Sequence, residues 1–125
     1  MTEPLDVVVL YVPRDATPGV LRALFAAGAG TIGDYAECAF VSPGTGQFRP
    51  LPGATPAQGR VGDLGRVEED RVELVLPRRL RRDVVAALRA AHPYEEPAFH
   101  VIECAVIEDA VPEASHLDGP DGAPR

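Results

Sequence analysis

The residues best suited to chemistry in this 125-residue chain lie in one short turn, His92-Pro93-Tyr94-Glu95-Glu96-Pro97. It places an imidazole close to two carboxylates, and zinc and related divalent ions accept both kinds of ligand. His100 and Cys104 follow on the next expected strand, where residues four positions apart lie on one face. The candidate metal ligands are His92, Glu95, Glu96, His100, Cys104 and Cys38. The alternative is a rigid turn, fixed by its prolines, with a helix-terminating histidine and exposed acids.

A glycine-rich segment, Gly28-Ala29-Gly30-Thr31-Ile32-Gly33, matches the G-x-G-x-x-G pattern of dinucleotide-binding folds. In those folds the pattern follows a strand and opens a helix. Here it follows an expected helix and leads into an expected strand, so it predicts a helix C-terminal cap and a tight turn. A nest of glycine amides that binds a phosphate is the alternative.

Two groups of charged residues have both a structural and a functional interpretation. Glu69, Arg71 and Glu73 alternate along an expected strand, so they project from one sheet face and predict a salt-bridge ladder. Four arginines open the second expected helix, where cations are electrostatically unfavourable, so an anionic partner is an alternative to plain solvation. These are Arg78, Arg79, Arg81 and Arg82.

Composition excludes several classes of protein. All twelve basic residues are arginine, which rules out a Schiff-base or P-loop lysine. The net charge of −7 is opposite to what nucleic-acid binding requires, and no apolar run approaches the roughly 20 residues of a membrane span. No nucleophilic triad is visible in the sequence, so no catalytic residue is assigned. With an acidic N-terminus unlike a secretory signal and two cysteines that suit free thiols, we expect a cytoplasmic protein.

An internal repeat indicates how these residues are positioned. The segment from Val9 to Gly28 aligns without a gap on the segment from Glu73 to His92, at a constant offset of 64 residues. In each copy an apolar strand precedes a proline, Pro13 or Pro77, and an amphipathic helix follows it. The chain is therefore expected to contain two equivalent strand–helix–strand units.

These units predict an α+β fold of ferredoxin-like βαββαβ type, a four-stranded antiparallel sheet with both helices on one face. The first helix is expected to begin at Thr17 as N-cap. The expected strands lie near 6–12, 35–42, 71–76 and 98–107, and the helices near 17–28 and 78–91. Because the first strand is apolar on both faces, another subunit is expected to cover the second face, and we predict a homo-oligomer.

A glycine- and proline-rich excursion, residues 43–66, separates the two units. So long an irregular connection usually serves a site or an interface. We expect an ordered loop pinned by apolar residues, namely Phe48, Leu51, Val61 and Leu64. Residues 1–112 are expected to form one domain, and residues 113–125 an acidic, disordered tail.

Several segments together resemble a known family. They are Leu24–Tyr35, Cys38-Ala39-Phe40, Gly44–Gly53 with Gly59 and Gly62, Glu68–Glu73, and His92–Ala98. The chain resembles, over about residues 6–107, the PII/CutA-like domain carried within YqfO-type members of the Nif-three-like family of dinuclear-metal proteins, and the free-standing equivalents of that domain.

The resemblance implies a PII/CutA-like fold, assembly as a homotrimer with sheets facing inward, and ligands in clefts between subunits. It places the excursion at the regulatory loop position of PII proteins. The dinuclear centre of the full-length family comes from residues outside this domain, so it is not carried over.

We therefore expect a non-catalytic small-molecule or metal binding and regulatory module, with a divalent metal as the one cofactor suggested. The candidate ligand-binding residues are Gly30, Ile32, Gly33, Tyr35, Gly44, Gly46, Phe48, Gly53, Gly59, Gly62 and Glu73. Two alternatives stay open: a metal-dependent hydrolase or metal-trafficking protein that uses the 92–97 turn, and a protein-interaction domain.

Overall fold

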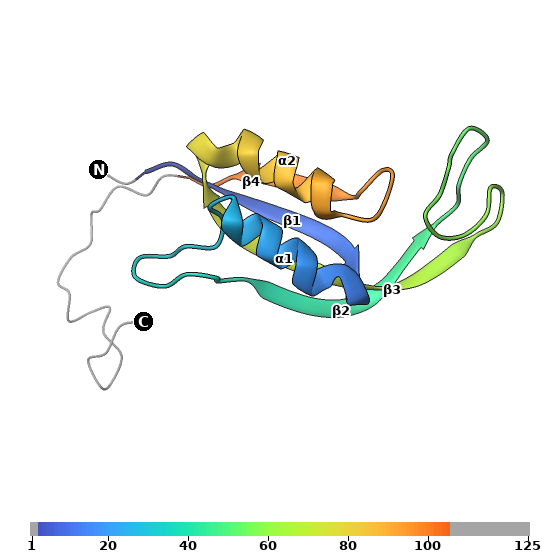
Figure 1. Cartoon of the computed structure of the whole chain (residues 1–125), viewed down its shortest axis with the longest axis horizontal. Helices are drawn as coiled ribbons and strands as arrows, with labels where there is room; N and C mark the ends of the chain where they lie inside the picture. Colours follow the sequence, from blue (N-terminus) through green and yellow to red (C-terminus); the bar gives the residue numbers. More distant parts are fainter. Residues whose placement is uncertain (1–2, 106–125) are drawn as a thin grey trace.

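A computed structural model describes residues 3–105 as a four-stranded antiparallel sheet with two helices packed on one face (Figure 1). The strand order is β2-β3-β1-β4, which confirms the predicted ferredoxin-like fold. None of the described helices has the length and apolar character needed to cross a membrane. The elements are β1 (Leu5–Pro13), α1 (Thr17–Ala26), β2 (Phe40–Phe48), β3 (Gly65–Pro77), α2 (Arg81–Ala91) and β4 (Phe99–Glu103), with short 3-10 turns η1 (Arg14–Ala16) and η2 (Arg78–Leu80).

The internal repeat is visible in the element boundaries. β1 and β3 end at the equivalent prolines Pro13 and Pro77, a 3-10 turn follows each, and α1 and α2 begin at the equivalent residues Thr17 and Arg81. The prediction of Thr17 as N-cap was wrong by one position, because η1 runs directly into α1 and leaves Ala16 at the cap. Thr17 is instead a buried residue of the first helical turn.

The core lies between the helices and one face of the sheet. Alternate residues of the central strands β1 and β3 point toward the helices, as the two-residue period of a strand requires. They pack against the apolar stripes of α1 and α2. The fully or almost fully buried members are Val8, Leu10, Val12, Val72, Leu74 and Leu76 from the sheet, and Val20, Leu24, Val84 and Leu88 from the helices.

The second strand and the excursion differ from their predicted bounds. β2 begins at Phe40 and pairs residue by residue with β3 as far as Phe48 opposite Gly65, so the irregular connection shortens to residues 49–64. Because β2 is an edge strand, Pro43 can occupy it without removing a ladder hydrogen bond from the sheet interior. The predicted strand end at Ile107 and the tail from residue 113 lie outside the described residues.

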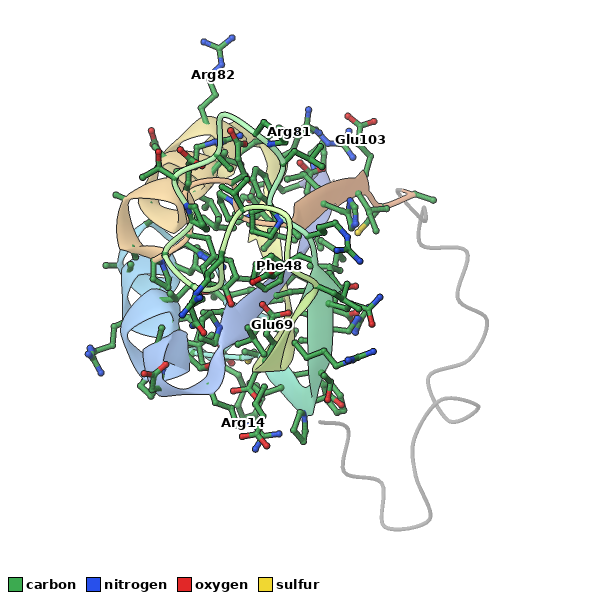
Figure 2. The ribbon with its side chains drawn as sticks, turned by 90° about the vertical axis from the view of Figure 1, so that its right-hand side faces the viewer. Arg14, Phe48, Glu69, Arg81, Arg82 and Glu103 are labelled. Carbon is green, nitrogen blue, oxygen red and sulfur yellow. The ribbon has the colours of Figure 1, made fainter. Side chains whose placement is uncertain are left out.

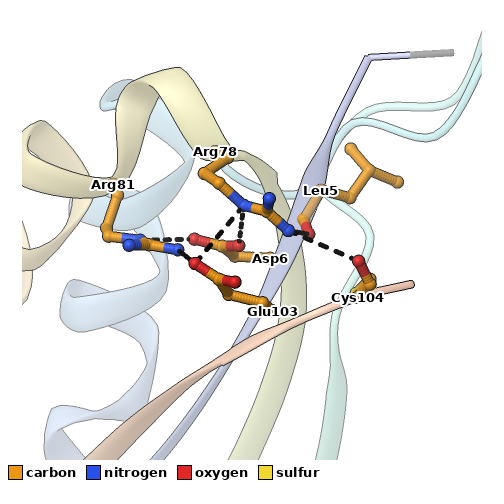
Figure 3. A network of polar contacts seen from close by, with 6 residues as sticks. All are labelled: Leu5, Asp6, Arg78, Arg81, Glu103 and Cys104. Atoms are coloured by element: carbon orange, nitrogen blue, oxygen red, sulfur yellow. Dashed lines mark hydrogen bonds and ion pairs between the residues drawn. The ribbon is translucent and has the colours of Figure 1, made fainter. Parts of the chain in front are cut away.

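A buried carboxylate explains two of the four clustered arginines. Asp6 is 0% exposed, and its two oxygens accept hydrogen bonds from Arg78 Nε at 2.8 Å and Arg81 Nε at 2.6 Å (Figure 3). Arg81 Nη2 also pairs with Glu103 Oε2 at 2.7 Å, while Nη2 of Arg78 donates to the carbonyls of both Leu5 and Cys104. The hydrogen bond from Arg81, with the help of Arg78, holds the pKa of Asp6 below its usual value against the opposing effect of burial.

The other two arginines lie outside this network. Arg79 pairs with Glu3 at 2.5 Å on the surface, whereas the side chain of Arg82 extends into solvent (Figure 2). The anionic partner expected as an alternative for the four arginines is, for Arg78 and Arg81, Asp6 of the same chain.

The repeat supplies a second carboxylate of the same kind. Asp70, which lies 64 positions after Asp6, is also buried and accepts a hydrogen bond from the Thr17 hydroxyl at 2.7 Å. Arg14 Nε approaches it to 3.7 Å. In each half, a strand carboxylate therefore holds the start of the other half's helix.

We expect Asp6→Asn to lower the free energy of unfolding by about 2 kcal/mol at pH 7. Losing one member of a buried ion pair leaves the other uncompensated, but Arg78 and Arg81 are partly exposed and can rehydrate, so the loss falls below the full effect. Because the folded pKa of Asp6 is lowered, its contribution is present above about pH 4 and is lost as the pH falls through the folded pKa. The wild-type advantage over the variant, measured by urea unfolding, should therefore narrow below pH 4.

The matched control is Glu3→Gln, which removes an exposed carboxylate from its pair with Arg79. We expect it to change stability by less than about 1 kcal/mol. Equal losses in the two variants would contradict the assignment of Asp6 as a structural anchor.

Candidate functional site

The irregular connection between β2 and β3 is closed mainly by backbone hydrogen bonds. The Gly62 amide donates to the Pro50 carbonyl at 2.8 Å, and Arg49 Nη1 donates to the Gly62 carbonyl at 2.7 Å. Gly53, Gly59 and Gly62 all have positive φ, which the reversals of this loop require. Three of the predicted apolar pins of this loop are exposed: Leu51, Val61 and Leu64.

The 92–97 turn is held against the sheet by His92. This residue is buried; its Nδ1 accepts from the Tyr94 amide at 3.1 Å, and its Nε2 lies 2.7 Å from the Tyr11 carbonyl. An acceptor at Nδ1 requires the proton on Nε2, so the ring is a neutral tautomer that donates to Tyr11. Both ring nitrogens are thereby used by the backbone, and neither is free to ligate a metal.

The predicted metal ligands are not brought together. His100 lies on β4 opposite Val9, and Cys38 lies in the connection from α1 to β2. Cys104, just beyond β4, lies at the opposite end of β1 from the His92 turn, where its amide donates to the Leu5 carbonyl and its carbonyl accepts from Arg78 Nη2. Within residues 3–105, no group of three or more His, Cys, Asp or Glu side chains is placed to hold a metal ion.

A pocket of about 360 Å³ lies where the 49–64 loop meets the 92–97 turn. The Thr55 amide donates to Glu95 Oε1 at 3.1 Å and ties the loop to the turn across the pocket. This size is within the range of small-molecule sites, and an apolar lining with few polar groups is typical of them. The lining residues are Phe48, Arg49, Pro50, Leu51, Ala54, Pro56, Ala57, Gln58, Tyr94, Glu95 and Glu96.

Tyr94, which lines the pocket, and Glu69, which lies near it, were not among the predicted site residues. The Tyr94 hydroxyl is buried without a hydrogen-bond partner among the described residues, and burial, aided by the nearby Glu69 carboxylate, raises its pKa. The Glu69 carboxylate lies over Gly46, where a β-carbon would collide with it. Both Phe48 and Glu69 lie near the middle of this end of the molecule (Figure 2). The position of Tyr94 within the proline-framed turn was the available signal.

The predicted ligand-binding residues divide between two ends of the sheet. Gly46, Phe48, Gly53, Gly59 and Gly62 belong to the end that carries the pocket, where Phe48 lies 6.5 Å from the Tyr94 ring. Gly44 faces open space on β2, and Glu73 on the open face of β3 pairs with Arg71 at 3.0 Å.

The glycine-rich segment lies at the other end, beside the start of β2 (Figure 1). Gly28 follows the end of α1 with a positive φ, and Ile32 and Tyr35 exchange backbone hydrogen bonds of 2.8 and 2.9 Å. The Gly30 amide donates to the Val75 carbonyl at 2.7 Å. This is the predicted helix cap and tight turn. Within one chain, its residues Gly30, Ile32, Gly33 and Tyr35 lie away from the loop pocket.

The sequence is similar to one part of longer curated proteins. No protein-family model matches the chain. The GTP cyclohydrolase 1 type 2 homolog of Mycobacterium tuberculosis is 58% identical over 97 residues, which make up 78% of this chain and 26% of that protein. The chain thus spans about a quarter of the length of the curated relatives it matches.

Solved structures show the same relationship in three dimensions. A Bacillus cereus protein related to NIF3 matches with a TM-score of 0.72 and 43% identity, over 83% of this chain and 26% of that one. The periplasmic divalent cation tolerance protein CutA of Archaeoglobus fulgidus matches with a TM-score of 0.58 and 15% identity, over 86% and 87% of the two chains. The second likeness shows the fold alone. Together these matches confirm the predicted resemblance to a CutA-like part of NIF3-related proteins.

We expect Tyr94→Phe to stabilise the free protein by about 1 kcal/mol, because the change removes a buried hydroxyl that lacks a partner and keeps the ring. Thermal unfolding should then shift upward by a few degrees. Tyr35→Phe, at an exposed position, is the control and should leave the midpoint unchanged. A clear loss of stability in Tyr94→Phe would mean that the hydroxyl is hydrogen-bonded in solution.

Proposed function

Because the chain is similar to one segment of the NIF3-related proteins and has the fold of CutA, we propose that it is a non-catalytic binding and regulatory module. Its ligand is a small molecule that occupies the pocket between the 49–64 loop and the 92–97 turn. The activity named in the relatives belongs to proteins of which this chain spans about a quarter.

The observation that carries this proposal is the pocket itself. It combines an apolar lining with a few polar side chains, and it lies in irregular segments held in place by a rigid sheet. The Thr55–Glu95 hydrogen bond fixes the loop against the turn without filling the space between them. A segment that only stabilised the fold would fill this space with side chains, as protein cores do. An open apolar pocket beneath the loop therefore supports a role in binding.

We further propose that the module is a homo-oligomer, a trimer in the arrangement that the resemblance suggests, with the open face of the sheet as the contact surface. The helices cover the opposite face, while Phe40 on β2 is 64% exposed and Ile102 on β4 is 53% exposed. Large apolar side chains left in water on a sheet face favour burial against another subunit.

Ala54→Trp tests the pocket directly. The indole should fill the space next to Leu51 and Pro56, so aromatic fragments that perturb the amide resonances of the loop and the turn in the wild-type protein should lose at least about tenfold in affinity. Nuclear magnetic resonance titration with a fragment library measures this. Val61→Trp introduces the same indole on the same loop but outside the pocket, and it should leave binding intact. Absence of fragment binding at the pocket of the wild-type protein would contradict the proposal.

Ile102→Asp tests the contact surface. We expect the wild-type protein to elute with a mass three times the 13.3 kDa of one chain in light scattering, and the variant to elute as a monomer, because a carboxylate cannot be buried there without a partner. Val61→Asp places the same charge on the loop and should not dissociate the assembly. A monomeric wild-type protein would rule out this contact.

A further inference from the structure

Some of the polar atoms that line the loop pocket already have hydrogen-bond partners, and others do not. Arg49 already donates Nη1 to the Gly62 carbonyl, and Glu95 already accepts from the Thr55 amide through Oε1. In the part of the chain that the structure describes, Glu95 Oε2 and the Glu96 carboxylate have no such partner. The groups left unused around the pocket are these carboxylate oxygens, which accept and do not donate, together with the other N–H groups of Arg49, the Gln58 amide and the Tyr94 hydroxyl, so that negative charges outnumber the single positive one.

The aromatic residues of the pocket favour the same kind of ligand. The Phe48 and Tyr94 rings lie 6.5 Å apart and are tilted by 43°, so they form an angled pair at one side of the pocket. Ring faces are electron-rich and attract organic cations, while their carbon surface packs against apolar groups. Leu51, Ala54 and Pro56 add apolar surface from the loop.

The charge balance of the lining disfavours an anionic ligand. The lining contains two glutamates and one arginine, and that arginine is partly engaged by a carbonyl. The whole chain carries a net charge of −7, which attracts cations to its surface and repels anions. An anionic ligand would meet this repulsion at close range.

We propose, on the premise of the binding function above, that the ligand is an amphipathic organic cation. Its apolar body, best filled by an aromatic ring, packs against Phe48, Tyr94 and the loop, and its ammonium or amidinium group binds Glu95 and Glu96. This pairing assigns Glu96, which has no part in the Thr55 bond, as the residue that selects for positive charge.

Three probes of the same shape and different charge test the inference: 2-phenylethylamine, 2-phenylethanol and 3-phenylpropionate. Their affinities are measured by magnetic resonance titration, read at the amides of residues 48–58 and 94–96. We expect the amine to bind about fivefold more tightly than the alcohol, and the acid to bind most weakly. Glu96→Gln should weaken the amine to the level of the alcohol and leave the alcohol unchanged.

Glu68→Gln is the matched control, because it removes one exposed carboxylate on β3 that does not line the pocket and should leave all three affinities unchanged. Equal binding of the three probes, tighter binding of the acid, or an amine affinity insensitive to Glu96→Gln would each overturn the inference and leave the binding function in place. A failure of all three probes to perturb the pocket would count against both the inference and the binding function itself.

Discussion

Two buried carboxylates, Asp6 and Asp70, tie the halves of this protein together. They occupy equivalent positions of the repeat, and each accepts hydrogen bonds from residues that open the helix of the other half, Arg78 and Arg81 for one and Thr17 for the other. A charge removed from water requires such partners, and for each aspartate they come from the other half. The duplication therefore produces two interdependent units, and the antiparallel pairing of β1 with β3 fixes their relative position.

The rest of the architecture follows from this arrangement. With both helices anchored over one face, the apolar residues of β1 and β3 close a single core, and the loops project from the ends of the sheet (Figure 1). His92 then extends the anchoring to the last turn through the Tyr11 carbonyl. The long hairpin of β2 and β3 carries the 49–64 loop to the same end, where Thr55 meets Glu95.

The same constraint separates scaffold from site. Residues that the scaffold uses are satisfied by internal partners, as the arginines around Asp6 and both nitrogens of His92 show. Around the loop pocket, by contrast, the Tyr94 hydroxyl is left without a partner and apolar side chains such as Leu51 are left in water. Unsatisfied groups of both kinds at one place are the physical reason for proposing a binding site there rather than at the glycine-rich turn.

The sequence by itself determined the element order, the fold class and the repeat, because strand and helix periodicity and the punctuation by Pro13 and Pro77 are local signals. It also favoured a helix cap over a dinucleotide-binding loop at Gly28, because the order of neighbouring elements is inverted there, but it left a phosphate-binding nest open as the alternative. Only the tertiary structure decided that Gly44 and Gly46 belong to a strand, because pairing with β3 overrides their turn preference.

Likewise, only the tertiary structure decided which hydrogen-bond partners the polar residues have. Spacing made His92 a good metal ligand, but its nitrogens are committed to the Tyr94 amide and, through Nε2, to the carbonyl of Tyr11, 81 positions away. The same spacing could not show that Glu95 ties down a loop 40 positions earlier. Hydrogen-bond partners distant in sequence are set by how the elements pack, and no local pattern encodes them.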